Sequence, residues 1–190
     1  MNTLRLYKPV KPHIVNQIFG VNRTMYSQFG LIGHNGIDLF TYHGQPVYAA
    51  HDGICYTEID NNQGHGVTIR THEQYECAGQ LVHFKTIYWH LEKSDAVVKT
   101  GQSVKAGDLI GYADNTGFST GDHLHFGLKP QVWDNSSWGW VNQLQNNGHL
   151  GAIDPTPFFT NTFAEHYKIM ILLNTTLVGV LEKLLARLKK

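Results

Sequence analysis

Short segments in which apolar and polar residues alternate, separated by glycine-rich turns, extend from residue 31 to about residue 129. The segment QPVYAAHDGICYTEID alternates, NNQGHG follows as a turn, and VTIRTH alternates again. A period of two is typical of strands with one buried face, and two such runs around a turn predict a β-hairpin. QLVHFKTIYWHLE predicts a third strand. This pattern restricts the fold most, because it predicts a mainly β domain.

The flanking segments follow other patterns. Residues 1–30 form an irregular lead-in, GQSVKAGDLIGYA predicts another strand pair with tight turns, and residues 130–151 predict a long polar and aromatic loop. The two prolines of DPTPFF close the domain, because proline cannot continue a strand ladder. Residues 163–189 predict a helix with apolar residues at spacings of three and four. These residues are Met170, Leu173, Leu177, Leu181, Leu184 and Leu188.

Length and charge narrow the class of protein. The 190 residues suffice for one domain with a substantial core. The 15 basic and 15 acidic residues balance, so nucleic acid is not an expected partner. The first 20 residues lack the apolar run of a secretory signal, and the most apolar run, IMILLNTTLVGVLEKLL, is too short and too polar for a membrane span. Cys55 and Cys77 are expected to be buried free thiols.

The segment GDHLHFGL carries two histidines one residue apart. On a strand, His123 and His125 would share one face, while Leu124 and Phe126 would point into the core. Two histidines on one face can bind the same metal, or one can bind while the other transfers protons. The chain has 12 histidines, so this pair needs partners elsewhere to be significant.

The segment GHNGIDLF supplies candidate partners. On an extended strand His34, Gly36 and Asp38 share a face, and the glycine between the two polar residues would leave an open space for an ion. Taken alone, the segment is more typical of a glycine turn that carries an ordinary histidine and aspartate.

The segment IYWHLEK adds His90, which would share its face with Tyr88, opposite to Trp89. Zinc in catalytic sites takes three protein ligands and keeps a position for water. His34, Asp38 and one histidine of the pair supply such a set. The other histidine and His90 then remain for the proton transfers that peptide hydrolysis requires. The residue pattern leaves open which histidine of the pair is the ligand.

In order and spacing, these segments resemble the lysostaphin-type zinc endopeptidases, which cut peptides of bacterial peptidoglycan. The resemblance covers roughly residues 25–159 and rests on GHNGIDLF, QPVYAAHDGIC, NNQGHGVTIR, YWHL, GQSVKAGDLIGYADNTGFSTGDHLHF and DPTPFF. It implies Zn²⁺ as the cofactor and a mainly β fold, an antiparallel β-sheet or sandwich of the duplicated hybrid motif type with a groove above it. A C-terminal α-helix would follow this domain.

The resemblance also implies roles for individual residues. It makes His34, Asp38 and His125 the zinc ligands, and it makes His90 and His123 the histidines that activate water and stabilise the developing oxyanion. Tyr26 lies near the place of a tyrosine that contacts the tetrahedral intermediate in some relatives. A packed loop tyrosine is the alternative for Tyr26.

The expected organisation has three parts: a lead-in over residues 1–24, a zinc endopeptidase catalytic domain over residues 25–160, and an amphipathic helix over residues 161–190. The helix would pack on its own domain, pair with a second copy, or dock to another protein or a membrane. The expected substrate is peptidoglycan peptide. The lack of a secretory signal favours a phage-encoded lysin that is released by lysis or carried in the virion tail. A fragment of a larger bacterial protein is the alternative.

Two alternatives have other functions. A catalytically inactive scaffold would bind peptidoglycan or activate an amidase, but such relatives usually lack several ligands. A structural virion protein would hold the metal without chemistry. In the loop over residues 130–151, three tryptophans would either line the groove or cover a small satellite core. They are Trp133, Trp138 and Trp140.

Overall fold

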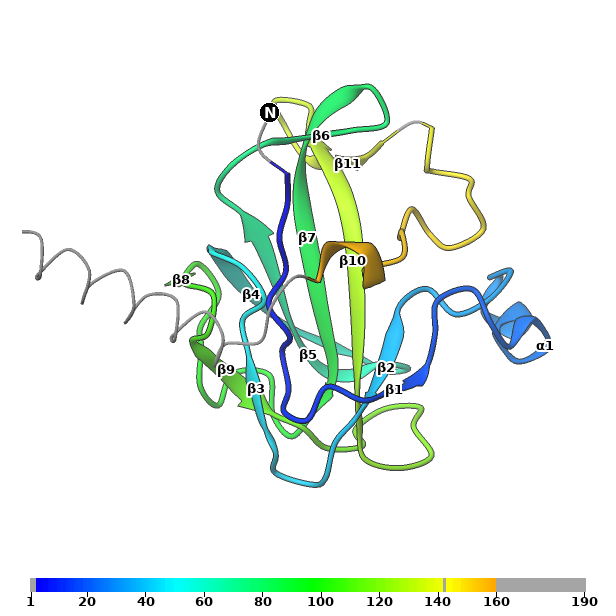
Figure 1. Cartoon of the computed structure of the whole chain (residues 1–190), viewed down its shortest axis with the longest axis vertical. Coiled ribbons are helices and arrows are strands. Elements are labelled where there is room, and N and C mark those ends of the chain that lie inside the picture. Colours follow the sequence, from blue (N-terminus) through cyan, green and yellow to red (C-terminus); the bar gives the residue numbers. More distant parts are fainter. Residues whose placement is uncertain (1–2, 142, 160–190) are drawn as a thin grey trace, which may run out of the picture.

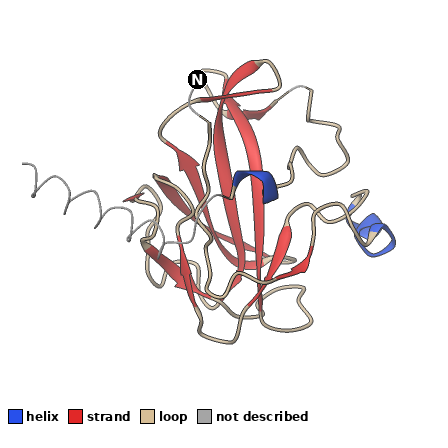
Figure 2. Ribbon diagram, in the orientation of Figure 1, coloured by secondary structure: helices blue, strands red, loops and turns tan. Residues whose placement is uncertain are grey.

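The computed structural model of the chain describes residues 3–141 and 143–159 (Figure 1). Strands and loops make up nearly all of it, and helices are few and short (Figure 2). The elements are β1 (Val15–Gln17), α1 (Arg23–Tyr26), η1 (Ser27–Phe29), β2 (Ile37–Phe40), β3 (Pro46–Tyr48), β4 (Gly53–Asp60), β5 (Gly64–Thr71), β6 (Tyr75–Cys77), β7 (Gln80–Leu91), β8 (Ser103–Val104), β9 (Leu109–Tyr112), β10 (His123–Trp133), β11 (Trp138–Trp140) and η2 (Thr156–Phe158).

A nine-stranded antiparallel sheet forms the body of the molecule. Its main path runs β1-β2-β10-β7-β5-β4-β8, with β11 added to β10 and β6 added to β7. The long strands β7 and β10 lie at its centre (Figure 1). The predicted hairpin is confirmed, because β4 and β5 pair from Gly53↔Thr71 to Asp60↔Gly64. The prediction of a mainly β, antiparallel fold is therefore confirmed.

One face of the sheet is closed by the core. Along β10, Leu124, Phe126 and Leu128 are fully buried, as strand alternation requires. The N-terminal segment and η2 lie across this face (Figure 1), and Leu6 joins the same buried cluster. The two-stranded sheet β3-β9 adds its own apolar side chains to the cluster. The opposite face is open and carries the polar residues considered below.

A buried tyrosine illustrates how the core satisfies its polar groups. Tyr88 is fully buried, and its hydroxyl oxygen accepts hydrogen bonds from the Ala50 amide at 2.8 Å and from Thr86 Oγ1 at 3.1 Å. Burial raises the pKa of Tyr88 above its usual 10, so the phenol stays neutral. Cys55 is buried and Cys77 half-buried, and both are free thiols.

Two expectations about strand pairing were wrong. The segment GQSVKAGDLIGYA does form two strands, but β8 pairs with β4 and β9 pairs with β3 instead of with each other. The first part of residues 130–151 is a strand rather than a loop, since β10 continues to Trp133 and pairs with β11. In both cases a partner from elsewhere in the chain supplies the hydrogen bonds that local alternation could not assign.

The predicted C-terminal helix over residues 161–190 lies outside the described residues. Within residues 3–141 and 143–159, no helix has the length and apolar character needed to cross a membrane.

Candidate metal centre

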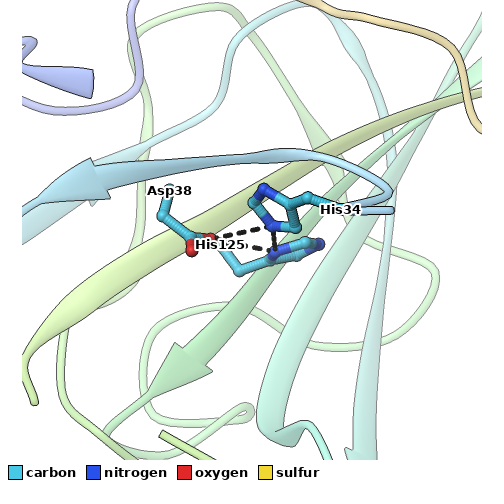
Figure 3. A group of neighbouring side chains, drawn as sticks. All are labelled: His34, Asp38 and His125. Carbon is cyan, nitrogen blue, oxygen red and sulfur yellow. Dashed lines mark hydrogen bonds and ion pairs between the residues drawn. The ribbon is translucent and has the colours of Figure 1, made fainter. Parts of the chain in front are cut away.

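Three side chains from the open face converge on one point (Figure 3). The Nε2 atom of His34 lies 2.9 Å from Nδ1 of His125, and each of these nitrogens lies 3.1 Å from Oδ1 of Asp38. Both imidazoles are buried, and the carboxylate is largely buried. These three residues form one group of potential ligand atoms that could hold a metal ion.

Strand pairing brings two of the three residues together. Asp38 on β2 and His125 on β10 are direct cross-strand partners, so their side chains project side by side from the same face. His34 precedes β2, and its backbone exchanges hydrogen bonds of 2.8 Å with Val21 and Gly20. The segment before β2 is thus tied to a distant loop, which places the third ring against the other two groups.

Gly36 serves a different purpose from the expected one. The expectation was an open space for an ion, but a Cβ added at Gly36 would lie 2.8 Å from Cε1 and 2.9 Å from Nε2 of His125. It would also lie 2.6 Å from the carbonyl oxygen of Phe126. The missing side chain therefore makes room for the imidazole of His125.

The hydrogen bonds around the cluster favour a bound cation. The Nδ1 atom of His34 lies 3.2 Å from the carbonyl oxygen of Ile18 and donates to it, so Nε2 is left with a lone pair. That lone pair faces the carboxylate of Asp38, which also only accepts. Ligand atoms around a tetrahedral zinc ion lie about 3.3 Å apart when the bonds are about 2.0–2.1 Å long. The observed spacing and the N and O donors fit zinc.

Charge and burial act in opposite directions on Asp38. Burial alone would raise the pKa of its carboxyl group, but the adjacent imidazoles of His125 and His34 outweigh that effect and hold the pKa far below its usual value. Burial lowers the pKa of His125. The cluster thus presents an ionised carboxylate beside a neutral imidazole, which are the protonation states that metal ligands need.

Two further histidines lie beside the cluster, and each is oriented by its Nδ1 atom. Nδ1 of His123 donates to the carbonyl oxygen of Gly121 at 2.8 Å, and its Nε2 lies 3.7 Å from Oδ1 of Asp38. Nδ1 of His90 donates to the carbonyl oxygen of Thr116 at 2.7 Å. The two rings are 4.5 Å apart between centroids. Each Nε2 therefore carries a lone pair that can accept a proton.

A β-bulge orients His90, and the sequence analysis missed it. Trp89 pairs with Gly66 and Leu91 pairs with His65, so His90 is an extra residue on β7, with φ of 65°. Tyr88 points into the core, whereas Trp89 and His90 both line the cavity described below. The expectation that His90 shares a face with Tyr88 was wrong, because the bulge interrupts the alternation on which it depended.

The loop that holds His90 depends on two glycines. An added Cβ at Gly64 would lie 2.4 Å from the backbone carbon of Thr116, and one at Gly117 would lie 2.3 Å from the amide nitrogen of Gly64. Both glycines have positive φ, which disfavours other residues. Thr116 Oγ1 also donates to the carbonyl oxygen of Leu91 at 2.7 Å. These contacts fix the carbonyl group that orients His90. In the sequence, only the glycines of NNQGHG and NTGFSTG indicated them.

Tyr26 stacks on His34, with ring centroids 5.1 Å apart and an angle of 18° between the rings. Its hydroxyl oxygen accepts a hydrogen bond from Gln17 Nε2 at 2.6 Å, which leaves its own hydrogen free to donate. Burial, with the charge of Asp38, raises the pKa of Tyr26 to about 12. Tyr26 is therefore a neutral donor on the cavity wall and also packs against a candidate ligand.

A cavity of about 700 Å³ opens over this face of the sheet. It is lined by Tyr26, Asp38, His90, His123 and His125, and it extends along the sheet past Ile87 and Trp89 to Lys129. Walls come from α1, η1 and the loops around residues 60–63 and 118–120. The cavity can therefore admit an extended chain to the cluster.

The three tryptophans of residues 133–140 are not among the described residues that line this cavity. Trp138 lies between Trp133 and the guanidinium of Arg70, at 5.1 Å between ring centroids and 3.9 Å from the guanidinium carbon. Trp140 lies under the ammonium of Lys129 at 4.8 Å. The tryptophans form an aromatic and cationic cluster farther along the open face.

Known proteins resemble the chain over much of its length. Lysostaphin of Staphylococcus simulans is 34% identical over 142 residues, which are 71% of this chain and 27% of that protein. Peptidoglycan DD-endopeptidase ShyB of Vibrio cholerae is 38% identical over 97 residues, which are 50% of this chain and 20% of that protein. The chain thus spans about a quarter or less of the length of these relatives.

Solved structures resemble it as well. A zinc containing peptidase from Vibrio cholerae is 31% identical, with a TM-score of 0.55 over 67% of this chain and 37% of that chain. The structure of lysostaphin from Staphylococcus simulans is 30% identical, with a TM-score of 0.53 over 77% of this chain and 48% of that one.

The match to a family profile includes the candidate metal centre. Residues 32–137 match the profile described as Peptidase family M23, and these residues make up more than half of the chain. They contain His34, Asp38, His90, His123 and His125. The chain belongs to peptidase family M23.

Proposed function

We propose that the protein is a zinc-dependent endopeptidase that hydrolyses peptide bonds in the stem or cross-bridge of bacterial peptidoglycan. One observation carries the proposal: a ligand set of two imidazoles and a carboxylate lies beside two further histidines whose Nε2 atoms can take up protons, and all of these residues except His34 line one cavity. His34 itself is fully buried and stacks on Tyr26.

In this proposal His34, Asp38 and His125 hold the zinc ion. When bound, zinc lowers the pKa of water and polarises the scissile carbonyl group. His123, whose Nε2 lies 3.7 Å from Oδ1 of Asp38, accepts the proton of the attacking water. Burial lowers the pKa of His90 to about 4, so this imidazole is neutral near pH 7 and is a second proton acceptor.

Tyr26 adds a hydrogen-bond donor in the same cavity. Because its hydroxyl oxygen already accepts from Gln17, its hydrogen can stabilise the oxyanion that develops on the scissile carbonyl. All six proposed site residues lie between Tyr26 and His125, which supports residues 25–160 as the catalytic domain.

The direct test measures release of new amino groups from purified cell wall. The wild-type protein should release them, a chelator should abolish the release, and added zinc should restore it. His123→Ala should bind zinc and release almost none. If zinc-loaded wild-type protein releases no amino groups from walls of several bridge types, the inactive scaffold is the better explanation.

The phage-lysin expectation belongs to the same proposal and needs a separate assay. Protein added to live cells should lyse them if it acts as a bacteriolytic enzyme. Digestion of purified walls without lysis of cells would contradict that part alone. Self-association through residues 161–190 is also still a prediction, tested by sedimentation of full-length chains against chains that end near residue 161.

A further inference from the structure

A cationic row crosses the open face at the end of the cavity away from the metal centre. Lys129 on β10 pairs with Lys85 on β7, and Lys85 pairs with Arg70 on β5. Because direct partners project from the same face, three positive side chains lie side by side. The cavity reaches this row at Lys129.

Lys129 and the candidate ligand His125 lie on the same face of β10. The positions alternate with the core residues, and Gly127 stands between them without a side chain. At about 3.3 Å per residue, four residues separate the two Cα atoms by about 13 Å. Ile87 and Trp89 of the neighbouring strand also line the cavity. An extended peptide can therefore run over this floor from the metal centre to Lys129.

The arginine of the row already has partners. Arg70 donates to Oε1 of Gln131 from Nε at 3.3 Å and from Nη2 at 3.2 Å, and its guanidinium packs on Trp138 and Tyr56. The guanidinium of Arg70 therefore has both aromatic rings and a hydrogen-bond acceptor as partners. Arg70 therefore stabilises the sheet and the tryptophan cluster, and it is not available to bind a ligand in the cavity.

The two lysines have no such partners among the described residues. No carboxylate lies within ion-pair distance of Lys129 or Lys85 there, and neither ammonium donates a hydrogen bond to another described residue. Glu58 is the acidic residue whose charge acts on both, but its Oε1 accepts from Thr68 Oγ1 at 2.8 Å. Within the described part of the chain, the ammonium of Lys129 packs only on the Trp140 ring.

Burial makes this arrangement costly. It lowers the pKa of Lys129 to about 8, with a further contribution from the charge of Lys85, and it lowers the pKa of Lys85 as well. A half-buried ammonium without a counter-ion loses hydration that nothing replaces. An anion that entered the cavity would restore a partner, and its hydrogen bond would be charge-assisted on both sides.

We propose that Lys129, supported by Lys85, binds a carboxylate of the substrate, so that the preferred substrate is an acidic peptide whose carboxylate lies within about four residues of the scissile bond. This inference rests on the proposed peptidase function and specifies its substrate class. A neutral glycine bridge offers no internal carboxylate and would leave the two ammonium groups without a partner.

The test compares carboxylate and carboxamide forms of one peptide with the full-length, zinc-loaded chain. The parent peptide is a wall fragment that the wild-type protein cleaves, and kcat/KM is measured for both forms. A charged hydrogen bond contributes about 1.5–3 kcal/mol, so the carboxylate form should be preferred by about 10-fold to 150-fold. Peptides with a side-chain carboxylate and with a C-terminal carboxylate identify which of the two is bound.

Variants connect the preference to Lys129. Lys129→Met should reduce the carboxylate preference to about one, Lys129→Arg should retain most of it, and Lys85→Met should reduce it partly. Lys105→Met is the matched control, because Lys105 is exposed and is not among the residues that line the cavity. Thermal unfolding and zinc content of each variant verify that it is folded and loaded.

The outcomes separate the two proposals. If the wild-type protein cleaves neither walls nor peptides, the proposed peptidase function fails. If it cleaves both peptide forms equally well, or prefers the carboxamide, the function stands and the carboxylate site is wrong. Retention of the full preference in folded Lys129→Met would also overturn the assignment.

Discussion

A single methyl group at Gly36 should weaken zinc binding although no ligand residue is replaced. The Cβ of Gly36→Ala would lie 2.6 Å from the Phe126 carbonyl oxygen and 2.8–2.9 Å from two atoms of the His125 ring. Ordinary Cβ contacts begin at 3.4 Å. The atoms must therefore separate by roughly 0.5–0.8 Å, which a packed site resists.

The imidazole is the part that can move. Ile37 and Phe126 are paired in the β2–β10 ladder, so the backbone there is held on both sides. Rotation of the His125 ring would carry Nδ1 away from Asp38. Overpacking of this kind costs about 1–3 kcal/mol. A poorly oriented ligand lowers metal affinity by about 10-fold to 100-fold, as loss of an orienting partner does.

Competition with a chromogenic chelator measures the zinc affinity of the wild-type protein and of Gly36→Ala. Gly139→Ala is the control, because its added Cβ would meet only Val132 atoms at 3.9 Å. Gly36→Ala should bind zinc about 10-fold to 100-fold more weakly, while the control stays at the wild-type value. A folded Gly36→Ala protein with wild-type zinc affinity would refute the reasoning that this glycine positions His125.

Three further predictions follow from the same structure. Alanine at any of the three proposed ligands should abolish zinc binding measured by metal analysis, whereas His123→Ala should keep the metal and lose turnover; loss of zinc from His123→Ala would reverse the assignment within the histidine pair. Burial lowers the pKa of His51 from 6.5 to about 4. Between these pH values the unfolded chain binds a proton at His51 that the folded chain does not bind. About 3 kcal/mol of the free energy of unfolding, which is fully present above pH 6.5, should therefore be lost as the pH falls toward 4. Denaturant titrations across that range should show a weaker pH dependence for His51→Gln. Tyr88→Phe should lower the free energy of unfolding by about 1–3 kcal/mol, because the buried Ala50 amide loses its acceptor. Tm should fall by about 2–4 °C per kcal/mol while zinc binding is retained. An unchanged Tm would contradict this prediction.

The sequence alone predicted the features that depend on local geometry. Alternation placed His123 and His125 on one face with Leu124 and Phe126 in the core, and the structure agrees. It also predicted the hairpin of β4 and β5. These predictions succeed because successive side chains on a strand point to opposite faces whatever the strand pairs with.

Pairing between distant segments was decided only by the tertiary structure. Alternation within one strand does not specify its neighbours, so the partners of β8 and β9 and the continuation of β10 past residue 130 were missed. The bulge at His90 exists because β7 has one more residue than β5 between the paired positions His65↔Leu91 and Gly66↔Trp89. The pairing of Lys129 with Lys85 likewise depends on where two long strands meet.

The sequence therefore determined which residues of each strand face outward, and the fold determined which outward residues meet. A strand carries its own period of two, because that period is a property of the extended backbone. Register depends on packing and hydrogen bonds between strands far apart in the chain. The convergence of His34, Asp38 and His125, and the cationic row beyond them, exist only once β2, β5, β7 and β10 lie side by side.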